Sequence, residues 1–78
     1  VTSNAQVRAN EATERTIKSA VTMVEAHFAT SFDGTNSEHI SKLNDFLDQI
    51  TVEEGTSAKD DVWVISANGE TIHHPSNQ

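Results

Sequence analysis

Four histidines are the residues of this chain whose type most readily suggests chemistry, because imidazole is the commonest side-chain ligand of protein-bound metals. Their spacing does not favour a metal site. His73 and His74 are neighbours in an expected strand and point to opposite faces, while His27 and His39 fall in two different expected helices, and the chain has no cysteine. We therefore predict no metal ligands and no cofactor, and interpret these histidines as surface or strand-end residues.

Two acidic pairs, Glu53-Glu54 and Asp60-Asp61, are the other candidates for chemistry, since paired carboxylates can act as general acid and base. Both pairs lie in polar, loop-like sequence and not in the apolar surroundings that tune such groups for catalysis. The sequence also lacks a glycine-rich phosphate loop, a serine or cysteine nucleophile motif and a zinc-hydrolase helix. We predict no catalytic residue and no enzymatic activity.

Residues 61–75 have the pattern of a β-hairpin. Two β-rich runs flank Asn68-Gly69, which is the strongest short-range sequence signal for a two-residue type I′ turn. Counting outward from that turn gives the expected cross-strand pairs, which are Ala67 with Glu70, Ser66 with Thr71, Ile65 with Ile72, Val64 with His73, and Trp63 with His74.

Side chains alternate along these strands, so the hairpin has two faces. Its more apolar face carries Trp63, Ile65, Ile72 and His74 and is expected to pack against helices. Trp63 is interpreted mainly as core, because few other aromatic residues are present, and His74 mainly as the strand end before Pro75. Since Trp63 and His74 share the apolar face, they are also the two candidate ligand-binding residues.

The rest of the chain predicts two helices and a loop. Residues 5–32 contain no glycine or proline and predict one helix of roughly 40 Å. Its second half has an apolar stripe, which consists of Ile17, Ala20, Val21, Val24 and Phe28. Its first half has only Val7 and small residues, so it is expected to project from the core or to meet a partner chain. A second helix is predicted over 37–50, with Ser37 as its N-cap, followed by a polar loop over 51–60.

These elements give an α+β fold class, with a long amino-terminal helix, a second short helix and then a hairpin that belongs to an incomplete antiparallel sheet. A chain of 78 residues forms one small domain with a thin core. Because a two-stranded hairpin is marginal in water, we expect the remaining strands to lie outside this sequence or to come from another chain. The first and last residues read like those of a fragment of a longer protein.

The composition bears on partners as well. Twelve acidic against five basic residues give a net charge of −7, which repels phosphate backbones and anionic lipid headgroups, so we expect no nucleic-acid partner. No apolar run approaches the roughly 20 residues of a bilayer span, so contact with a membrane is expected only through segments outside this chain.

The order of these elements and the hairpin sequence resemble the Cache family of bacterial sensor domains, which are PAS-like modules of chemotaxis receptors, sensor kinases and cyclic-dinucleotide enzymes. The resemblance rests on the strand Val62-Trp63-Val64-Ile65, the turn glycine Gly69, the ending His74-Pro75, and the helical start Asn4 to Ala12. It covers all 78 residues but only the amino-terminal half of one module. Three later strands of the family's five-stranded sheet are absent from this chain, and Lys59-Asp60-Asp61 departs from the family's usual sequence.

The resemblance implies an extracytoplasmic ligand-sensing domain of a bacterial transmembrane receptor, most often a methyl-accepting chemotaxis protein. It implies a periplasmic or extracellular location, as part of an inner-membrane protein. The expected ligand is an amino acid, an organic acid or an amine, held between sheet and helices. A homodimer through the long helix is the expected assembly.

Two alternatives stay open. The domain is the sensor part of a histidine kinase or diguanylate cyclase, or it is a non-sensing helical dimerisation module. A coiled coil would sustain apolar positions over several heptads, whereas here the pattern lapses between Val7 and Ile17. That lapse favours the sensor over the dimerisation module.

Overall fold

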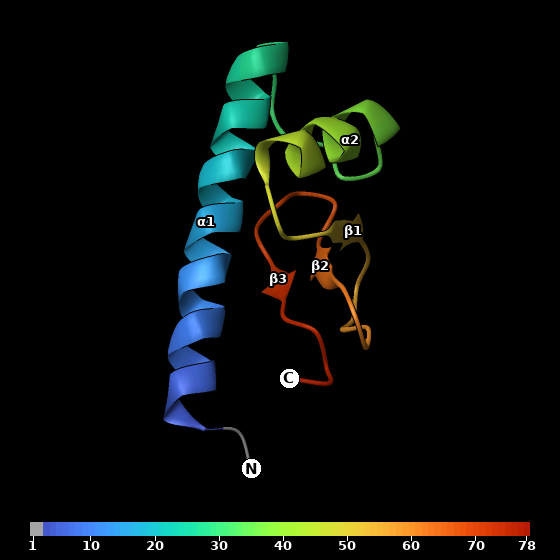
Figure 1. Cartoon of the computed structure of the whole chain (residues 1–78). Helices are drawn as coiled ribbons and strands as arrows, with labels where there is room; N and C mark the ends of the chain where they lie inside the picture. Colours follow the sequence, from blue (N-terminus) through green and yellow to red (C-terminus); the bar gives the residue numbers. More distant parts are fainter. Residues whose placement is uncertain (1–2) are drawn as a thin grey trace.

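The structure, a computed structural model, describes residues 3–78. Its elements follow in the order α1 (Asn4–Phe28), α2 (Ser37–Phe46), β1 (Val52–Glu54), β2 (Trp63–Ile65) and β3 (Ile72–His73) (Figure 1). The strands form one sheet in the order β1-β2-β3, with β1 parallel and β3 antiparallel to β2. The α+β class expected from the sequence is confirmed, but the sheet is mixed and not antiparallel.

Helix α1 begins where Ser3 caps it, since the Ser3 hydroxyl accepts a hydrogen bond from the Gln6 N–H at 3.1 Å. The prediction that this helix reaches residue 32 is wrong. Ala29 takes a left-handed conformation with φ 55°, and its N–H donates to the Glu25 carbonyl, which ends the helix at Phe28. The Glu25 carboxylate accepts the Phe32 N–H at 2.9 Å, so the chain folds back and Phe32 enters the core.

Helix α2 is shorter than predicted and starts with a different cap. The Asn36 side chain accepts hydrogen bonds from the N–H groups of Glu38 and His39, so Asn36 is the N-cap and Ser37 is the first helical residue. The helix ends at Phe46 and not at residue 50, because Leu47 is extended and directs its side chain into the core.

Strand β1 lies inside the segment 51–60, for which the sequence predicted only a loop. The strand has three residues, and Val52 is its one apolar side chain. Its pairing with β2 places Val52 beside Trp63 and Glu54 beside Ile65. The loop prediction was wrong because β1 forms through main-chain pairing with β2, and no side-chain pattern in the segment reveals that pairing.

The hairpin has the predicted register but a different turn. Val64 pairs with His73 and Ile65 with Ile72, as counted from the sequence. The turn is not type I′, because Gly69 alone in this loop has a positive φ, 76°, and its N–H donates to the Ser66 carbonyl at 2.9 Å. Glycine is required there, since an added Cβ would lie 2.9 Å from the Phe32 ring.

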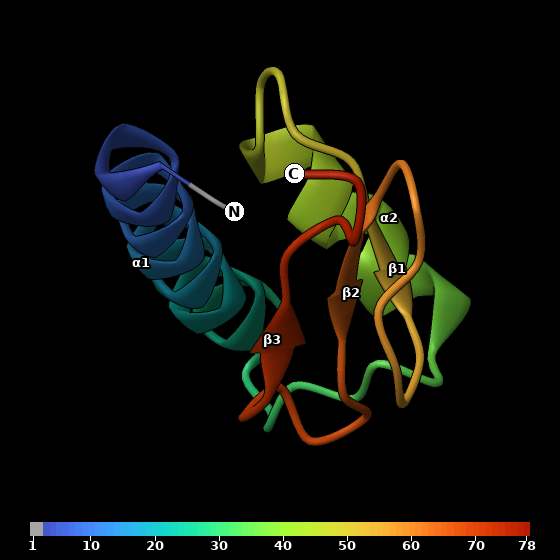
Figure 2. The same ribbon diagram turned by 90° about the horizontal axis from the view of Figure 1, so that it is seen from below.

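The core lies between the helices and one face of the sheet. It combines apolar residues of α1, α2, the segments after them and the sheet, which are Ile17, Ala20, Val21, Val24, Phe32, Leu43, Leu47, Val52, Trp63 and Ile65. This confirms that the hairpin face with Trp63 and Ile65 packs against the helices. Figure 2 shows β3 as the strand nearest to α1, with β2 and β1 following across the sheet.

The other face of the sheet is covered by the connection from β1 to β2. Val64 points to that face and is fully buried, with its Cγ1 3.0 Å from the position of a Cβ on Gly55. On the same face, the Lys59 ammonium pairs with the Glu53 carboxylate at 2.8 Å. The central strand β2 is therefore buried on both sides although the sheet has only three strands.

Candidate ligand-binding pocket

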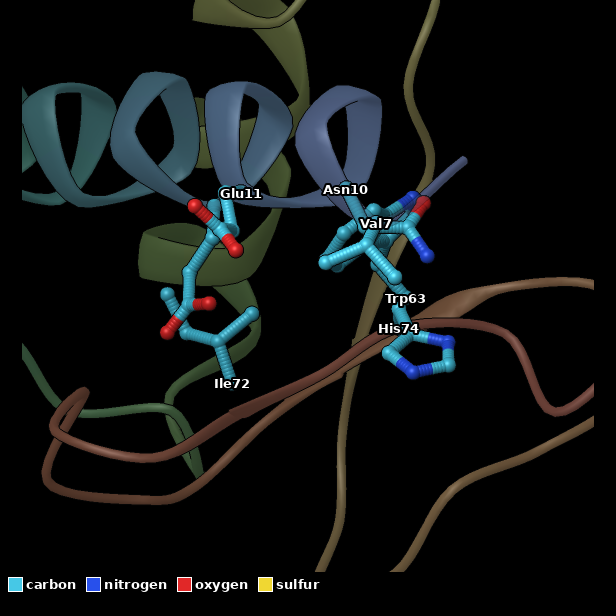
Figure 3. A pocket seen from close by; sticks show the side chains of 7 residues that line it. Val7, Asn10, Glu11, Trp63, Ile72 and His74 are labelled. Carbon is cyan, nitrogen blue, oxygen red and sulfur yellow. The ribbon is translucent and has the colours of Figure 1, made fainter. Parts of the chain in front are cut away.

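A pocket of about 200 Å³ opens between the first half of α1 and the hairpin. We call it the Trp63 pocket, and it is lined by Val7, Asn10, Glu11, Glu14, Trp63, Ile72 and His74. Figure 3 shows the side chains from α1 pointing toward those from β2, β3 and the residue after β3. Four of the seven lining residues are thus on the helix and three are on the hairpin.

The two residues predicted as ligand contacts, Trp63 and His74, both line this pocket. Their rings are 6.3 Å apart between centroids and lie edge to face, at 69°. Trp63 is only 7% exposed, so it is a core residue with one side at the pocket, whereas His74 is exposed. Their common face follows from the alternation of side chains along the paired strands.

The α1 residues of the pocket continue the buried stripe of that helix. Residues Ile17, Val21 and Val24 recur at spacings of four and three, and the same spacing runs back to Glu14, Asn10 and Val7. Asn10 is 9% exposed, so it occupies a core position, and its Oδ1 accepts a hydrogen bond from Gln6 Nε2 at 3.1 Å. Two polar residues, Asn10 and Glu14, therefore occupy positions at which the stripe would otherwise be apolar.

The sequence analysis missed Asn10, Glu11 and Glu14 as lining residues, although their signal was present. The lapse in the apolar stripe between Val7 and Ile17 argues against a coiled coil and predicts a first half that projects from the core or meets a partner chain. In the structure the lapse coincides with the pocket. A polar residue at a core-facing helix position is a sign of a site, because burying it without function costs stability.

The electrostatics of the pocket are negative. Glu11 and Glu14 are carboxylates, and no lysine or arginine is among the described residues that line it. Glu14 pairs with Lys18 at 3.5 Å, and that ammonium is more than half exposed. Glu11 forms no ion pair with any residue in the described part of the chain.

The ring of His74 is oriented by a hydrogen bond to its own chain. Its Nδ1 lies 2.9 Å from the carbonyl oxygen of Pro75. A carbonyl only accepts, so Nδ1 carries the proton in this bond, and in the neutral ring Nε2 is left as an acceptor.

The remaining histidines lie elsewhere, and residues 3–78 hold no group of three side chains suited to a metal ion. His39 is buried, stacks on Phe28 with centroids 4.6 Å apart, and accepts the Asp33 N–H at its Nδ1. His27 lies against Phe28 at the end of α1, and His73 points to the opposite sheet face from His74.

Three of the four carboxylates in the acidic pairs have partners within the described residues. Asp60 accepts the Ser76 hydroxyl, and Asp61 accepts the Asn77 amide, each at 2.7 Å. Glu53 accepts the hydrogen bond from Lys59, and this bond raises the pKa of Lys59. These contacts tie the carboxyl-terminal residues and the connection after β1 to the sheet.

A second, more open groove lies between the end of α1 and α2, where it is lined by His27, Phe28, Ser37, Glu38, Ser41, Lys42 and Asp45. Most of these side chains are exposed, and the groove contains no residue predicted as a ligand contact. The Trp63 pocket is the better candidate because two of its lining residues, Asn10 and Trp63, are buried.

Neither helix in residues 3–78 is long and apolar enough to cross a bilayer. No protein-family model matches the chain, and neither a curated protein nor a solved structure matches it.

Proposed function

We propose that this chain senses a small molecule at the Trp63 pocket, as part of an extracytoplasmic domain of a bacterial transmembrane receptor. The methyl-accepting chemotaxis type is the receptor class we favour. The observation that carries the proposal is the placement of Asn10 and Glu14 at core-facing positions of α1, opposite the Trp63 ring. A protein that needed only stability would place apolar residues there.

The pocket is well placed to change how α1 is held. Between Ala5 and Thr16, Asn10 is the one buried residue of the helix, whereas the second half buries four residues in the core, which are Ile17, Ala20, Val21 and Val24. A ligand between Trp63 and this first half would add contacts that the empty pocket lacks. Its differential affinity for two positions of the helix would then shift their populations.

The receptor context rests on the sequence resemblance to Cache sensors. Its residues have specific places in this fold: Gly69 supplies the left-handed turn residue, and Pro75 is buried two residues after the end of β3. The same arguments apply to the sensor part of a histidine kinase or diguanylate cyclase, in which the output module alone would differ.

A helical dimerisation module is the second candidate, and one observation favours it. Ala5, Ala9 and Ala12 are exposed on α1, and so are Val7 and Met23, at 42% and 49%. Small exposed residues permit the close approach of a second helix. The two functions are compatible, because a dimer of α1 helices could carry the sensed change onward.

A thermal-shift screen of the whole chain tests the sensing proposal. Amino acids, organic acids and amines are each added at millimolar concentration, and a ligand should raise Tm by an amount that grows with the logarithm of its concentration above Kd. The rise in Tm should disappear in Glu14→Leu, because this substitution removes a carboxylate that lines the pocket. It should persist in Asp48→Asn, a change at an exposed site outside the pocket. A screen in which no class of compound raises Tm would overturn the proposal.

Dimerisation is measured separately, by analytical ultracentrifugation of the chain and of Ala9→Glu. A monomer at all concentrations would remove the dimerisation module as a function. A dimer that Ala9→Glu dissociates would support it.

A further inference from the structure

We infer that the Trp63 pocket selects a small organic cation, a primary or quaternary amine, over anions and neutral molecules of the same shape. This inference rests on the proposed sensing function and chooses one ligand class for it.

Charge is the first argument. Glu11 and Glu14 contribute two carboxylates to the lining, and no cationic side chain among the described residues shares it. Lys18 reaches one of the two, Glu14, at 3.5 Å, which leaves Glu11 without an ionic partner in residues 3–78. An anionic ligand would be repelled here, whereas an ammonium group would complete the charge pairing.

The aromatic wall is the second argument. Trp63 has the side chain with the strongest cation–π attraction, and it is held rigidly because it is nearly buried in the central strand β2. A cation bound in the pocket would lie between this ring and the Glu11 carboxylate of α1 (Figure 3).

The hydrogen-bonding groups are the third argument. The Pro75 carbonyl takes the Nδ1 proton of His74, so the neutral ring offers Nε2 as an acceptor. With the carboxylates of Glu11 and Glu14, the lining is rich in acceptors. A primary alkylammonium ion donates N–H hydrogen bonds to this set, whereas choline donates only through its hydroxyl and its quaternary nitrogen contributes charge alone.

Size limits the ligand further. The pocket holds about 200 Å³, which is below the roughly 300 to 1,000 Å³ of pockets for drug-sized molecules. The cation is therefore expected to be small and compact, with few heavy atoms beyond the charged group.

The test uses four probes that separate charge from shape. Choline and n-butylamine are the cations, 3,3-dimethyl-1-butanol is the neutral isostere of choline, and butyrate is the anion. Binding is followed by the fluorescence of Trp63, which is the one tryptophan of the chain and forms the pocket wall. Isothermal titration calorimetry gives the Kd independently.

Both cations should saturate the signal, and the neutral isostere should bind at least roughly fivefold more weakly. Glu11→Gln should weaken choline binding by a similar factor, because it removes the unpaired carboxylate and keeps the side-chain shape. Asp48→Asn removes one charge outside the pocket and should leave the Kd unchanged.

Equal affinity for choline and its neutral isostere, or tighter binding of butyrate, would overturn the cation inference and leave the sensing proposal standing. Silence of all four probes would also overturn the inference. The sensing proposal would then stand or fall on the wider thermal-shift screen, where ligands of another class can still bind.

Discussion

The side-chain amide of Asn44 in α2 pairs with both main-chain polar groups of Val52 in β1. Asn44 Nδ2 donates to the Val52 carbonyl at 2.9 Å, and Asn44 Oδ1 accepts the Val52 N–H at 2.8 Å. This two-bond contact imitates a strand partner at the outer edge of the sheet. It holds the start of β1 against α2. Because β1 pairs with β2, this contact also helps to position Trp63.

The first prediction removes this contact. Asn44→Ala should lower the free energy of unfolding by about 2 kcal/mol, since three hydrogen bonds are lost, one of them to the Ile40 carbonyl, and two main-chain groups of Val52 lose their partner. Urea denaturation measures the change. Asn77→Ala removes one bond at an exposed site and should change the free energy by less than about 0.5 kcal/mol. Equal changes in the free energy of unfolding for both variants would show that the Asn44 contact stabilises the fold no more than an exposed hydrogen bond does.

The second prediction concerns the end of α1. Ala29 has φ 55°, a conformation that costs an L-residue roughly 1–2 kcal/mol and a glycine almost nothing. Ala29→Gly should therefore stabilise the protein, by about 0.5–1 kcal/mol after the greater backbone entropy of unfolded glycine is counted. Thermal unfolding checks the sign of the change.

The matched control is Ala26→Gly, three residues earlier and inside the helix, at another exposed site. There the same substitution should destabilise by about 1 kcal/mol, because glycine is unfavourable in a helix interior. If both substitutions destabilised the protein, residue 29 would not hold the left-handed conformation in solution.

Contacts between residues far apart in the sequence explain which parts of the fold could not be predicted. The spacing of apolar residues by three and four revealed the second half of α1, and counting outward from Asn68-Gly69 predicted the hairpin register, because both signals are local in sequence. The helix ends were wrong because no glycine or proline marks them. The Glu25 contact with Phe32 and the Asn44 contact with Val52 position the chain there, and both join residues that no local pattern connects.

The hairpin side of the candidate site could be predicted from the sequence, but the α1 side could not. Trp63 and His74 were found because alternation along a strand places them on one face. The contribution of α1 was missed because a polar residue at a core-facing position resembles a surface residue until the fold is known. Asn10 is the clearest case, being buried in the structure and ordinary in the sequence.

The third prediction concerns the turn before α2. The hydroxyl and the N–H of Thr35 both donate to the Asp33 carboxylate, at 2.6 and 2.9 Å, and lower the pKa of Asp33 from its ordinary value of 3.8. A lowered pKa means that this contact stabilises the fold above the ordinary Asp pKa and is lost as the pH falls through the pKa of the folded state.

Thr35→Val removes the hydroxyl, which is the largest cause of the shift, and should move the pKa of Asp33 back toward 3.8. NMR titration of the Asp33 carboxyl carbon in the two proteins measures this change. The stability difference between the two proteins should be present at neutral pH and should vanish in acid. A difference that grew as the pH fell would contradict this assignment.

The fourth prediction joins stability to the proposed function at Asn10. Asn10→Leu is nearly isosteric and restores an apolar residue to the buried stripe, so it should raise the free energy of unfolding by about 1 kcal/mol. Asn10→Ala gains helix propensity but fills no space, and the difference between the two variants isolates the packing contribution.

The same Asn10→Leu substitution should weaken choline binding, because it replaces a polar side chain in the lining of the Trp63 pocket by an apolar one. A variant that is more stable and binds less tightly would indicate that the polar stripe residues serve the ligand at the expense of the core. If Asn10→Leu were less stable than Asn10→Ala, or bound choline as tightly as the unmodified chain, Asn10 would be neither a stripe position nor a pocket wall.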